Sequence, residues 1–129
     1  MGANERLGLP RQDGMEQFIL CVDVDGTLIT NNDPDRVHGV PSKDEVPHVP
    51  IINTVMVLST FKNIKVVVWS GGGKQYAETW GRRLGLDDYV WRYASKLEHE
   101  DIKKHGRIIA IDDIQDTAIG DINLIVRNK

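Results

Sequence analysis

Two aspartates, Asp23 and Asp25, stand at the end of an apolar run that starts at Phe18, and Gly26 follows them directly. Because residues two apart in a strand project to the same face, the two carboxylates would lie close together where a buried strand ends. Neighbouring carboxylates repel each other, and burying them is costly unless a cation or a proton compensates the charge. The spacing therefore indicates a site that binds a metal ion or transfers protons.

A second acidic pair, Asp112 and Asp113, follows another apolar run, residues 107–111. Together with Asp23 and Asp25, these side chains would form a hard, oxygen-rich site at the ends of two strands. Such a site suits Mg²⁺, which prefers carboxylate and carbonyl oxygens as ligands. We therefore expect the two acidic pairs to lie around one Mg²⁺ ion.

A serine and a run of glycines end a third apolar run: residues 64–69 are followed by Ser70 and by glycines at 71–73. A serine hydroxyl can donate a hydrogen bond to a phosphate, and glycines allow the backbone to approach it closely. Lys96, at the start of a predicted helix, would balance the negative charge of the carboxylates and the phosphate. Carboxylates, a phosphate cradle and a lysine together predict a phosphoryl-transfer site, where catalysis is mainly positioning and neutralisation of charge.

Strand-type and helix-type patterns alternate along the chain, which indicates an α/β fold with a parallel sheet and helices on both faces. Turn residues and prolines favour a long loop between residues 29 and 50. Ligands of such sheets bind beyond the carboxyl ends of the strands, where the acidic pairs and Ser70 are expected. The predicted strands span residues 18–22, 64–69, 89–93, 107–111 and 122–126, and the predicted helices span residues 51–62, 74–84 and 96–105.

The composition is that of one ordinary globular domain. The chain has 129 residues, of which 40% are apolar and 27% charged, with a formal net charge of −3. This balance argues against a general nucleic-acid binder, and no apolar run is long enough to span a bilayer. We expect a flexible leader over residues 1–17 and a single domain over residues 18–129. Cys21 is the sole cysteine, which excludes an intrachain disulfide and favours a reducing, cytoplasmic location.

Four segments resemble the sequence motifs of the haloacid dehalogenase-like (HAD) hydrolase superfamily. Residues 23–28, with the sequence Asp-Val-Asp-Gly-Thr-Leu, match its first motif, and residues 64–70 resemble its second, an apolar strand that ends in Ser or Thr. Lys96 resembles the third-motif lysine, and residues 108–113 resemble the fourth motif, an apolar strand that ends in two acids. The resemblance covers residues 18–126 and implies a doubly wound, Rossmann-like, mostly parallel five-stranded sheet.

The resemblance implies a Mg²⁺-dependent phosphatase that works through an aspartyl-phosphate. Asp23 would be the nucleophile that attacks phosphorus, and it would also contact the metal, which offsets its repulsion from the phosphate. Asp25 would be the general acid that protonates the leaving oxygen and then the base that activates water, and its backbone carbonyl would bind the metal. Thr27 would support the turn after Asp25.

The remaining motif residues would bind the metal and the phosphoryl group. Asp113 would be the direct metal ligand, with Asp112 directed toward Lys96 and the water shell of the metal. The motif leaves open which of the two aspartates touches the ion. Ser70 and Lys96 would hold the phosphoryl oxygens.

The chain has no room for the cap domain that many members of this superfamily carry. Residues 30–50 could form a short flap, whereas a folded domain needs about 50 residues or more. The resemblance therefore implies a capless member with an open site. The phosphorylated substrate would be large, such as a nucleic-acid end or a protein, or a small molecule if a second subunit of an oligomer covers the site. Arg36, His38 and Lys43 are candidate substrate contacts.

The alternative function is a catalytically silent binding or regulatory domain on the same scaffold. Such a domain needs neither Asp23 nor Asp25, so the presence of both favours an enzyme. A dehalogenase needs no acid two residues after its nucleophile, and a phosphomutase needs a cap that excludes water. Both of these reactions are therefore disfavoured, and a HAD-type phosphomonoesterase is the function that the sequence predicts.

Overall fold

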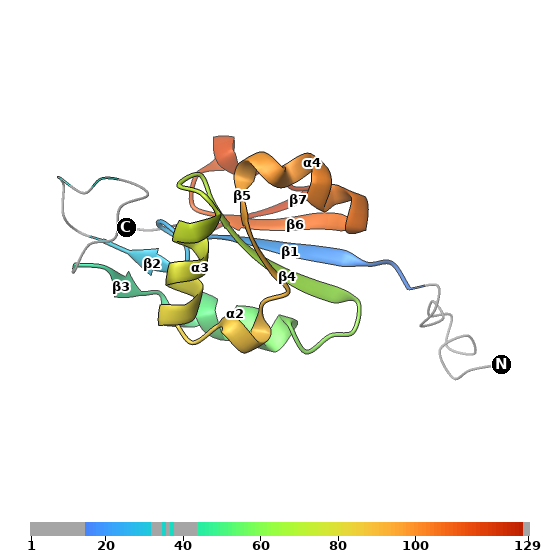
Figure 1. Ribbon diagram of the computed structural model, residues 1–129, viewed down its shortest axis with the longest axis horizontal. Helices are drawn as coiled ribbons and strands as arrows, with labels where there is room; N and C mark the ends of the chain where they lie inside the picture. Colours follow the sequence, from blue (N-terminus) through green and yellow to red (C-terminus); the bar gives the residue numbers. More distant parts are fainter. Residues whose placement is uncertain (1–14, 32–34, 36, 38–43, 128–129) are drawn as a thin grey trace.

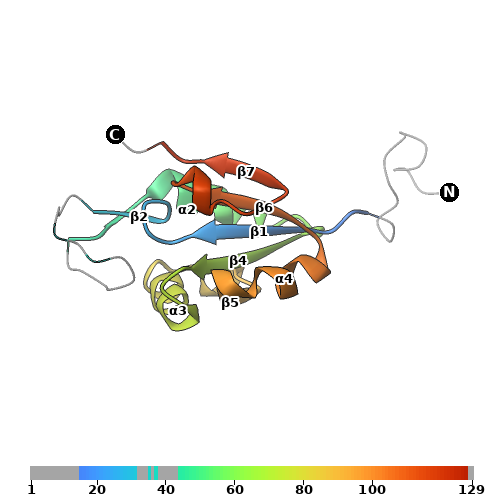
Figure 2. The same cartoon turned by 90° about the horizontal axis from the view of Figure 1, so that it is seen from above.

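The computed structural model describes residues 15–31, 35, 37 and 44–127, which form an α/β fold around one five-stranded sheet (Figure 1). All the strands of this sheet run parallel, in the order β5-β4-β1-β6-β7, so that β1 is central (Figure 2). The parallel α/β sheet predicted from the sequence is confirmed. The strands are β1 Phe18–Asp23, β4 Ile64–Ser70, β5 Arg92–Ser95, β6 Arg107–Asp112 and β7 Ile122–Ile125.

The central strand β1 is buried on both faces because its side chains are apolar on both. Ile19 and Cys21 belong to one apolar cluster, and Leu20 and Val22 belong to a second, larger cluster. All four side chains are at most 1% exposed, as is typical of a parallel strand between two layers. The alternation places the two clusters on opposite faces of the sheet and holds β1 firmly between them.

Helices cover both faces of the sheet. Figure 1 shows α2 and α3 on one side and α4 on the other, and the two apolar clusters join them to the strands accordingly. No helix in the described ranges is long and apolar enough to cross a membrane. The helical elements are α2 Val49–Leu58, α3 Lys74–Arg83 and α4 His99–Ile102, with the 3₁₀ turns η3 Lys96–Glu98 and η4 Lys103–His105 on either side of α4.

The third strand begins later than the sequence predicts. Residues 89–93 have the aromatic and β-branched composition of a strand, whereas β5 spans Arg92–Ser95 and Asp87–Tyr89 form the 3₁₀ turn η2. Main-chain pairing with β4 starts only at Trp91, whose N–H donates to the Val66 carbonyl at 2.8 Å. The predicted bounds were wrong because the register of an edge strand is decided by its neighbour rather than by its own apolar residues.

Helix α2 is displaced toward the N-terminus relative to the prediction of residues 51–62. It begins at Val49, with Pro50 in the first turn, where a missing N–H costs nothing. It ends at Leu58 because the hydroxyls of Ser59 and Thr60 donate to carbonyls of its last turn, at 2.6 and 2.7 Å. Such bonds compete with continuation of the helix.

The stretch predicted as a loop contains two very short strands. β2, Ile29–Thr30, and β3, Val46–Pro47, pair antiparallel and lie near the carboxyl end of β1 (Figure 1). Arg36, His38 and Lys43, the candidate substrate contacts, lie outside the described residues.

The predicted leader is described only at its end. Residues 1–14 lie outside the described residues. Gln17 donates from its side chain to the Asn63 carbonyl at 2.8 Å. The chain is therefore held against the domain immediately before β1.

The carboxyl ends of three neighbouring strands meet at one edge of the sheet. Asp23 is the last residue of β1, Ser70 of β4 and Asp112 of β6. In the parallel register, Asp23 is paired with Trp69, the residue before Ser70, so these ends lie level with each other. The sheet thus brings the polar residues at the ends of these three strands together at one edge.

Candidate active site

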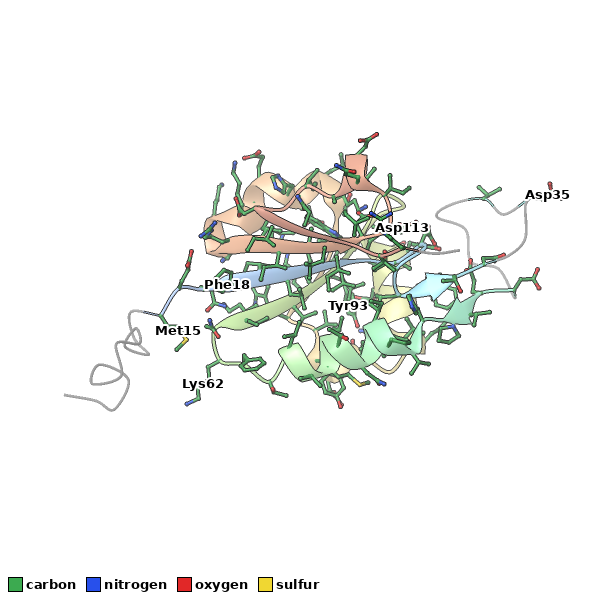
Figure 3. The ribbon with its side chains drawn as sticks, turned by 180° about the vertical axis from the view of Figure 1, so that it is seen from behind. Met15, Phe18, Asp35, Lys62, Tyr93 and Asp113 are labelled. Carbon is green, nitrogen blue, oxygen red and sulfur yellow. The ribbon has the colours of Figure 1, made fainter. Side chains whose placement is uncertain are left out.

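A cavity of about 270 Å³ opens at this edge of the sheet. Five of the six residues predicted from the sequence motifs line it, and the sixth, Asp112, is 1% exposed and contacts the lining residue Lys96. Figure 3 marks Asp113 at the end of β6, beside the turn that follows β1. The lining residues come from four separate segments of the chain: Asp23, Asp25, Ser70, Gly71, Gly72, Lys96, Asp113, Ile114 and Thr117.

Lys96 joins two of the predicted carboxylates. Its Nζ lies 3.0 Å from Asp23 Oδ1 and 2.7 Å from Asp112 Oδ2. The lysine side chain is 16% exposed, and those of the two aspartates are 9% and 2% exposed, so water screens these ion pairs little. The lysine is therefore held in the cavity wall by ion pairs with the last residues of β1 and β6.

Three carboxylates surround a space that could hold a metal ion. Asp23, Asp112 and Asp113 each present one oxygen, and these oxygens all lie within 4.8 Å of one another. Oδ1 of Asp113 is buried and has no hydrogen-bond partner among the described residues. A buried carboxylate oxygen without a partner is costly, and a hard cation would satisfy it. The donor set is thus of the type that fits Mg²⁺.

Burial perturbs the pKa values of this cluster. It raises the pKa of Asp23 to about 7, against the opposing charge of Lys96 and with added repulsion from Asp112 and Asp113. Burial is also the main cause of the raised pKa of Asp113. Burial by itself would lower the pKa of Lys96, but the neighbouring carboxylates of Asp23 and Asp112 hold that pKa above its ordinary value. One lysine does not neutralise three carboxylates, so a second cation would favour their ionised forms.

The turn after β1 places Asp25 beside the cavity. The N–H groups of Leu28 and Ile29 both donate to the Val24 carbonyl, at 3.0 and 3.1 Å, which folds the chain back on itself. Gly26 has φ +78°, and a Cβ built on it would lie 2.0 Å from Asp113 Oδ2. Glycine is therefore needed here both for the backbone conformation and for the close approach of the two acidic segments.

Ser70 lies where β4 ends and is 2% exposed. Its Oγ accepts a hydrogen bond from the Gly72 N–H at 2.9 Å, so the hydroxyl proton remains for donation to a ligand. Gly71 and Gly72 are exposed and line the cavity, and α3 begins immediately after the glycine run. This segment thus places a hydroxyl group and exposed backbone beside the cavity.

A capping box fixes the position of Lys96. The Ser95 side chain accepts from the Leu97 N–H at 3.2 Å, and Glu98 accepts from the Ser95 N–H at 2.7 Å. These bonds start η3 directly at the end of β5, so the first residue of the turn is held at the sheet edge. Lys103 and Lys104, the next lysines along the chain, are exposed and do not line this cavity.

The two adjacent aspartates at the end of β6, Asp112 and Asp113, have different surroundings. Asp112 accepts hydrogen bonds from the Ile114 N–H at 3.1 Å and from the Thr117 hydroxyl at 3.3 Å, in addition to its ion pair with Lys96. Asp113 lines the cavity and keeps one oxygen without a partner among the described residues. The first carboxylate is therefore committed to protein contacts, and the second is available to a ligand.

Sequence reasoning missed two residues that contact the predicted set. Thr117, in the 3₁₀ turn η5 Gln115–Thr117, donates to both oxygens of Asp112. Tyr76, in the first turn of α3, donates from its hydroxyl to Asp25 Oδ1 at 2.5 Å. Neither belongs to a motif, and the apolar face of α3 explains the tyrosine ring by packing alone. Only the tertiary structure identifies the hydroxyl contact.

No protein-family model matches this chain, and no curated protein matches it either. The geometry of the site is therefore the basis on which its function is considered.

Proposed function

We propose that this protein is a Mg²⁺-dependent phosphatase that hydrolyses phosphomonoesters through an aspartyl-phosphate on Asp23. The observation that carries the proposal is the arrangement around that carboxylate. It contacts Lys96 at 3.0 Å, lies within 4.8 Å of Asp112 and Asp113 oxygens, and shares a cavity with Asp25 and Ser70. The side chains that would serve as nucleophile, proton donor, metal ligands and phosphate-binding donors thus lie at one sheet edge.

We assign the fold, as part of the same proposal, to the doubly wound, Rossmann-like type of the HAD superfamily, without a cap domain. The strand order supports this assignment. Asp23, the proposed nucleophile, is the last residue of the central strand β1, and the cavity lies beyond the carboxyl ends of the strands. The described residues between β1 and α2 contribute only the two short strands β2 and β3. Between Ser70 and Lys96 there are only α3, η2 and β5.

The residues present fit a Mg²⁺ ion, and Asp23, Asp113 and the Asp25 backbone carbonyl would hold it. Asp112 would act through Lys96 and the water shell of the metal. The bound ion would supply positive charge that offsets the repulsion between the Asp23 carboxylate and a phosphate.

The side chains of this chain then divide the reaction into two displacements. Asp23 attacks phosphorus, and the bond from phosphorus to the leaving oxygen breaks while Asp25 gives its proton to that oxygen. Asp25 next takes a proton from water as the water oxygen bonds to phosphorus and the bond to Asp23 breaks. Lys96 and Ser70 would hold the phosphoryl oxygens in both steps, because their donors border the same cavity.

The proposed substrate is a phosphorylated macromolecule, such as a nucleic-acid end or a phosphoprotein. The cavity is open, and the described residues provide no covering domain above it. A small phosphorylated molecule would be the substrate if a second subunit covered the cavity. Cys21, the sole cysteine, is buried as a free thiol, which supports our proposal of a reducing, cytoplasmic location.

The test is hydrolysis of an aryl phosphate with and without Mg²⁺. We expect activity that EDTA abolishes and that Asp23→Asn lowers by at least about 1,000-fold, as for loss of a covalent nucleophile. Asp88→Asn, at an exposed carboxyl that does not line the cavity, is the matched control and should retain wild-type rates. Activity that survives Asp23→Asn, or that needs no divalent metal, would contradict the mechanism.

A further inference from the structure

Tyr76 joins the apolar core to the turn that carries Asp25. Its side chain is 7% exposed and its ring belongs to the larger apolar cluster. Its hydroxyl donates to Asp25 Oδ1 at 2.5 Å, a contact between residues 51 positions apart in the chain. Asp25 is only partly buried and lines the cavity. A rigidly packed donor thus holds one oxygen of a carboxyl group at the edge of the site.

We propose that Tyr76 is a positioning residue, which holds the carboxyl group of Asp25 in the orientation that transfers a proton to the leaving oxygen. This inference rests on the proposed phosphatase function. The hydrogen bond engages Oδ1 and thereby orients Oδ2, the oxygen that would carry the transferable proton. Proton transfer depends steeply on the geometry of donor and acceptor. A carboxyl group held in one orientation therefore transfers its proton faster than one that rotates.

The tyrosine keeps its own proton throughout the reaction. In the first displacement the Asp25 proton goes to the leaving oxygen as its bond to phosphorus breaks. In the second displacement Asp25 takes a proton from the attacking water as the bond between phosphorus and Asp23 breaks. Both transfers use Oδ2, and the hydrogen bond from Tyr76 to Oδ1 persists through both.

Tyr76→Phe separates the hydroxyl from the ring. The variant keeps the aromatic packing in the core and deletes the hydroxyl that donates to Asp25. The matched control is Tyr93→Phe, which also deletes a tyrosine hydroxyl that donates to an aspartate, here Asp87 at 2.9 Å. Figure 3 marks Tyr93, which does not line the cavity.

The experiment compares two substrates that differ only in the leaving group. 4-Nitrophenolate departs readily without a proton, whereas the alkoxide released from an alkyl phosphate requires one. The quantity measured is kcat/KM, because it covers binding and formation of the aspartyl-phosphate, the step in which the leaving group departs. We expect Tyr76→Phe to lower kcat/KM for the alkyl phosphate about 10- to 100-fold, a part of what general acid catalysis supplies. For 4-nitrophenyl phosphate the change should stay within about threefold.

A double-mutant cycle tests whether the hydroxyl acts through Asp25. In the Asp25→Asn background, Tyr76→Phe should cause no further loss on the alkyl phosphate, because the group that it positions is already absent. Tyr93→Phe should leave both substrates at wild-type rates.

The outcomes distinguish this inference from the proposed function. A wild-type protein that hydrolyses neither substrate overturns both. An active wild type whose Tyr76→Phe variant keeps the ratio of the two kcat/KM values overturns only the role of Tyr76, whether both rates fall equally or neither changes. Additive losses in the double mutant overturn it as well.

Discussion

At the scale of single residues, Asp23 combines burial with an excess of negative charge. Its side chain is 9% exposed and contacts Lys96 at 3.0 Å. Two further carboxylates lie beside it, and the same lysine is shared with one of them. Without a bound metal ion the site therefore carries more negative than positive charge, and this excess has a consequence for stability as well as for catalysis.

We expect the metal-free protein to lose stability as the pH rises from about 4 to about 7. The pKa of Asp23 is about 7 in the folded protein, above its ordinary value of 3.8. A raised pKa contributes stability that is complete below the unfolded-state value and is lost as the pH rises through the folded-state value. Urea denaturation in EDTA should therefore show the free energy of unfolding falling across this window.

Asp23→Asn should flatten that pH dependence, because the variant removes the group whose pKa is raised most clearly in the cluster. Asp88→Asn, at an exposed carboxyl outside the cavity, should keep the wild-type slope. Added Mg²⁺ should restore stability to the wild type near pH 7 by binding the ionised carboxylates. An unchanged slope in Asp23→Asn would show that the destabilising group lies elsewhere.

At the scale of elements, the turn after β1 and the end of β6 depend on a close approach at Gly26. Gly26→Ala would place a Cβ 2.0 Å from Asp113 Oδ2, at a backbone φ of +78°. We expect the variant to displace Asp113 and to weaken Mg²⁺ binding at least about tenfold, as misplacement of a metal ligand does. Isothermal titration calorimetry with Mg²⁺ measures the change.

Gly71→Ala is the matched control for this prediction. Gly71 also lines the cavity, but a Cβ there would meet no atom within 4 Å, and its φ is not positive. Its Mg²⁺ affinity should remain at the wild-type value. Equal affinities in the two variants would mean that Asp113 does not hold the metal.

The elements that carry the site were predictable because their signals are local. β1, β4 and β6 are continuous apolar runs that end in polar residues, and their ends agree with the prediction to within one residue. β5 was predicted with wrong bounds because an edge strand starts where its neighbour offers hydrogen-bond partners. The observed bounds matter, because a strand that ends at Ser95 places the next residue, Lys96, at the cavity.

At the scale of the whole molecule, one chain supplies every predicted site residue. The six motif residues lie at one sheet edge without a contribution from a second copy. We therefore expect the activity per molecule on 4-nitrophenyl phosphate to be independent of protein concentration. The measurement is a rate series over about 100-fold in protein, with the oligomeric state followed by light scattering. A specific activity that rises as the protein associates would instead indicate a cavity completed by a second subunit.

The sequence by itself determined which polar groups follow the buried strands. Asp23, Asp25, Ser70 and the pair Asp112–Asp113 were identified because alternation and strand exits are properties of neighbouring residues. The tertiary structure alone decided how these groups differ. In the folded chain, Asp112 accepts hydrogen bonds from the protein, one oxygen of Asp113 has no hydrogen-bond partner among the described residues, and the Tyr76 hydroxyl donates to Asp25. Those differences arise from packing between segments far apart in the chain, and no local pattern encodes such contacts.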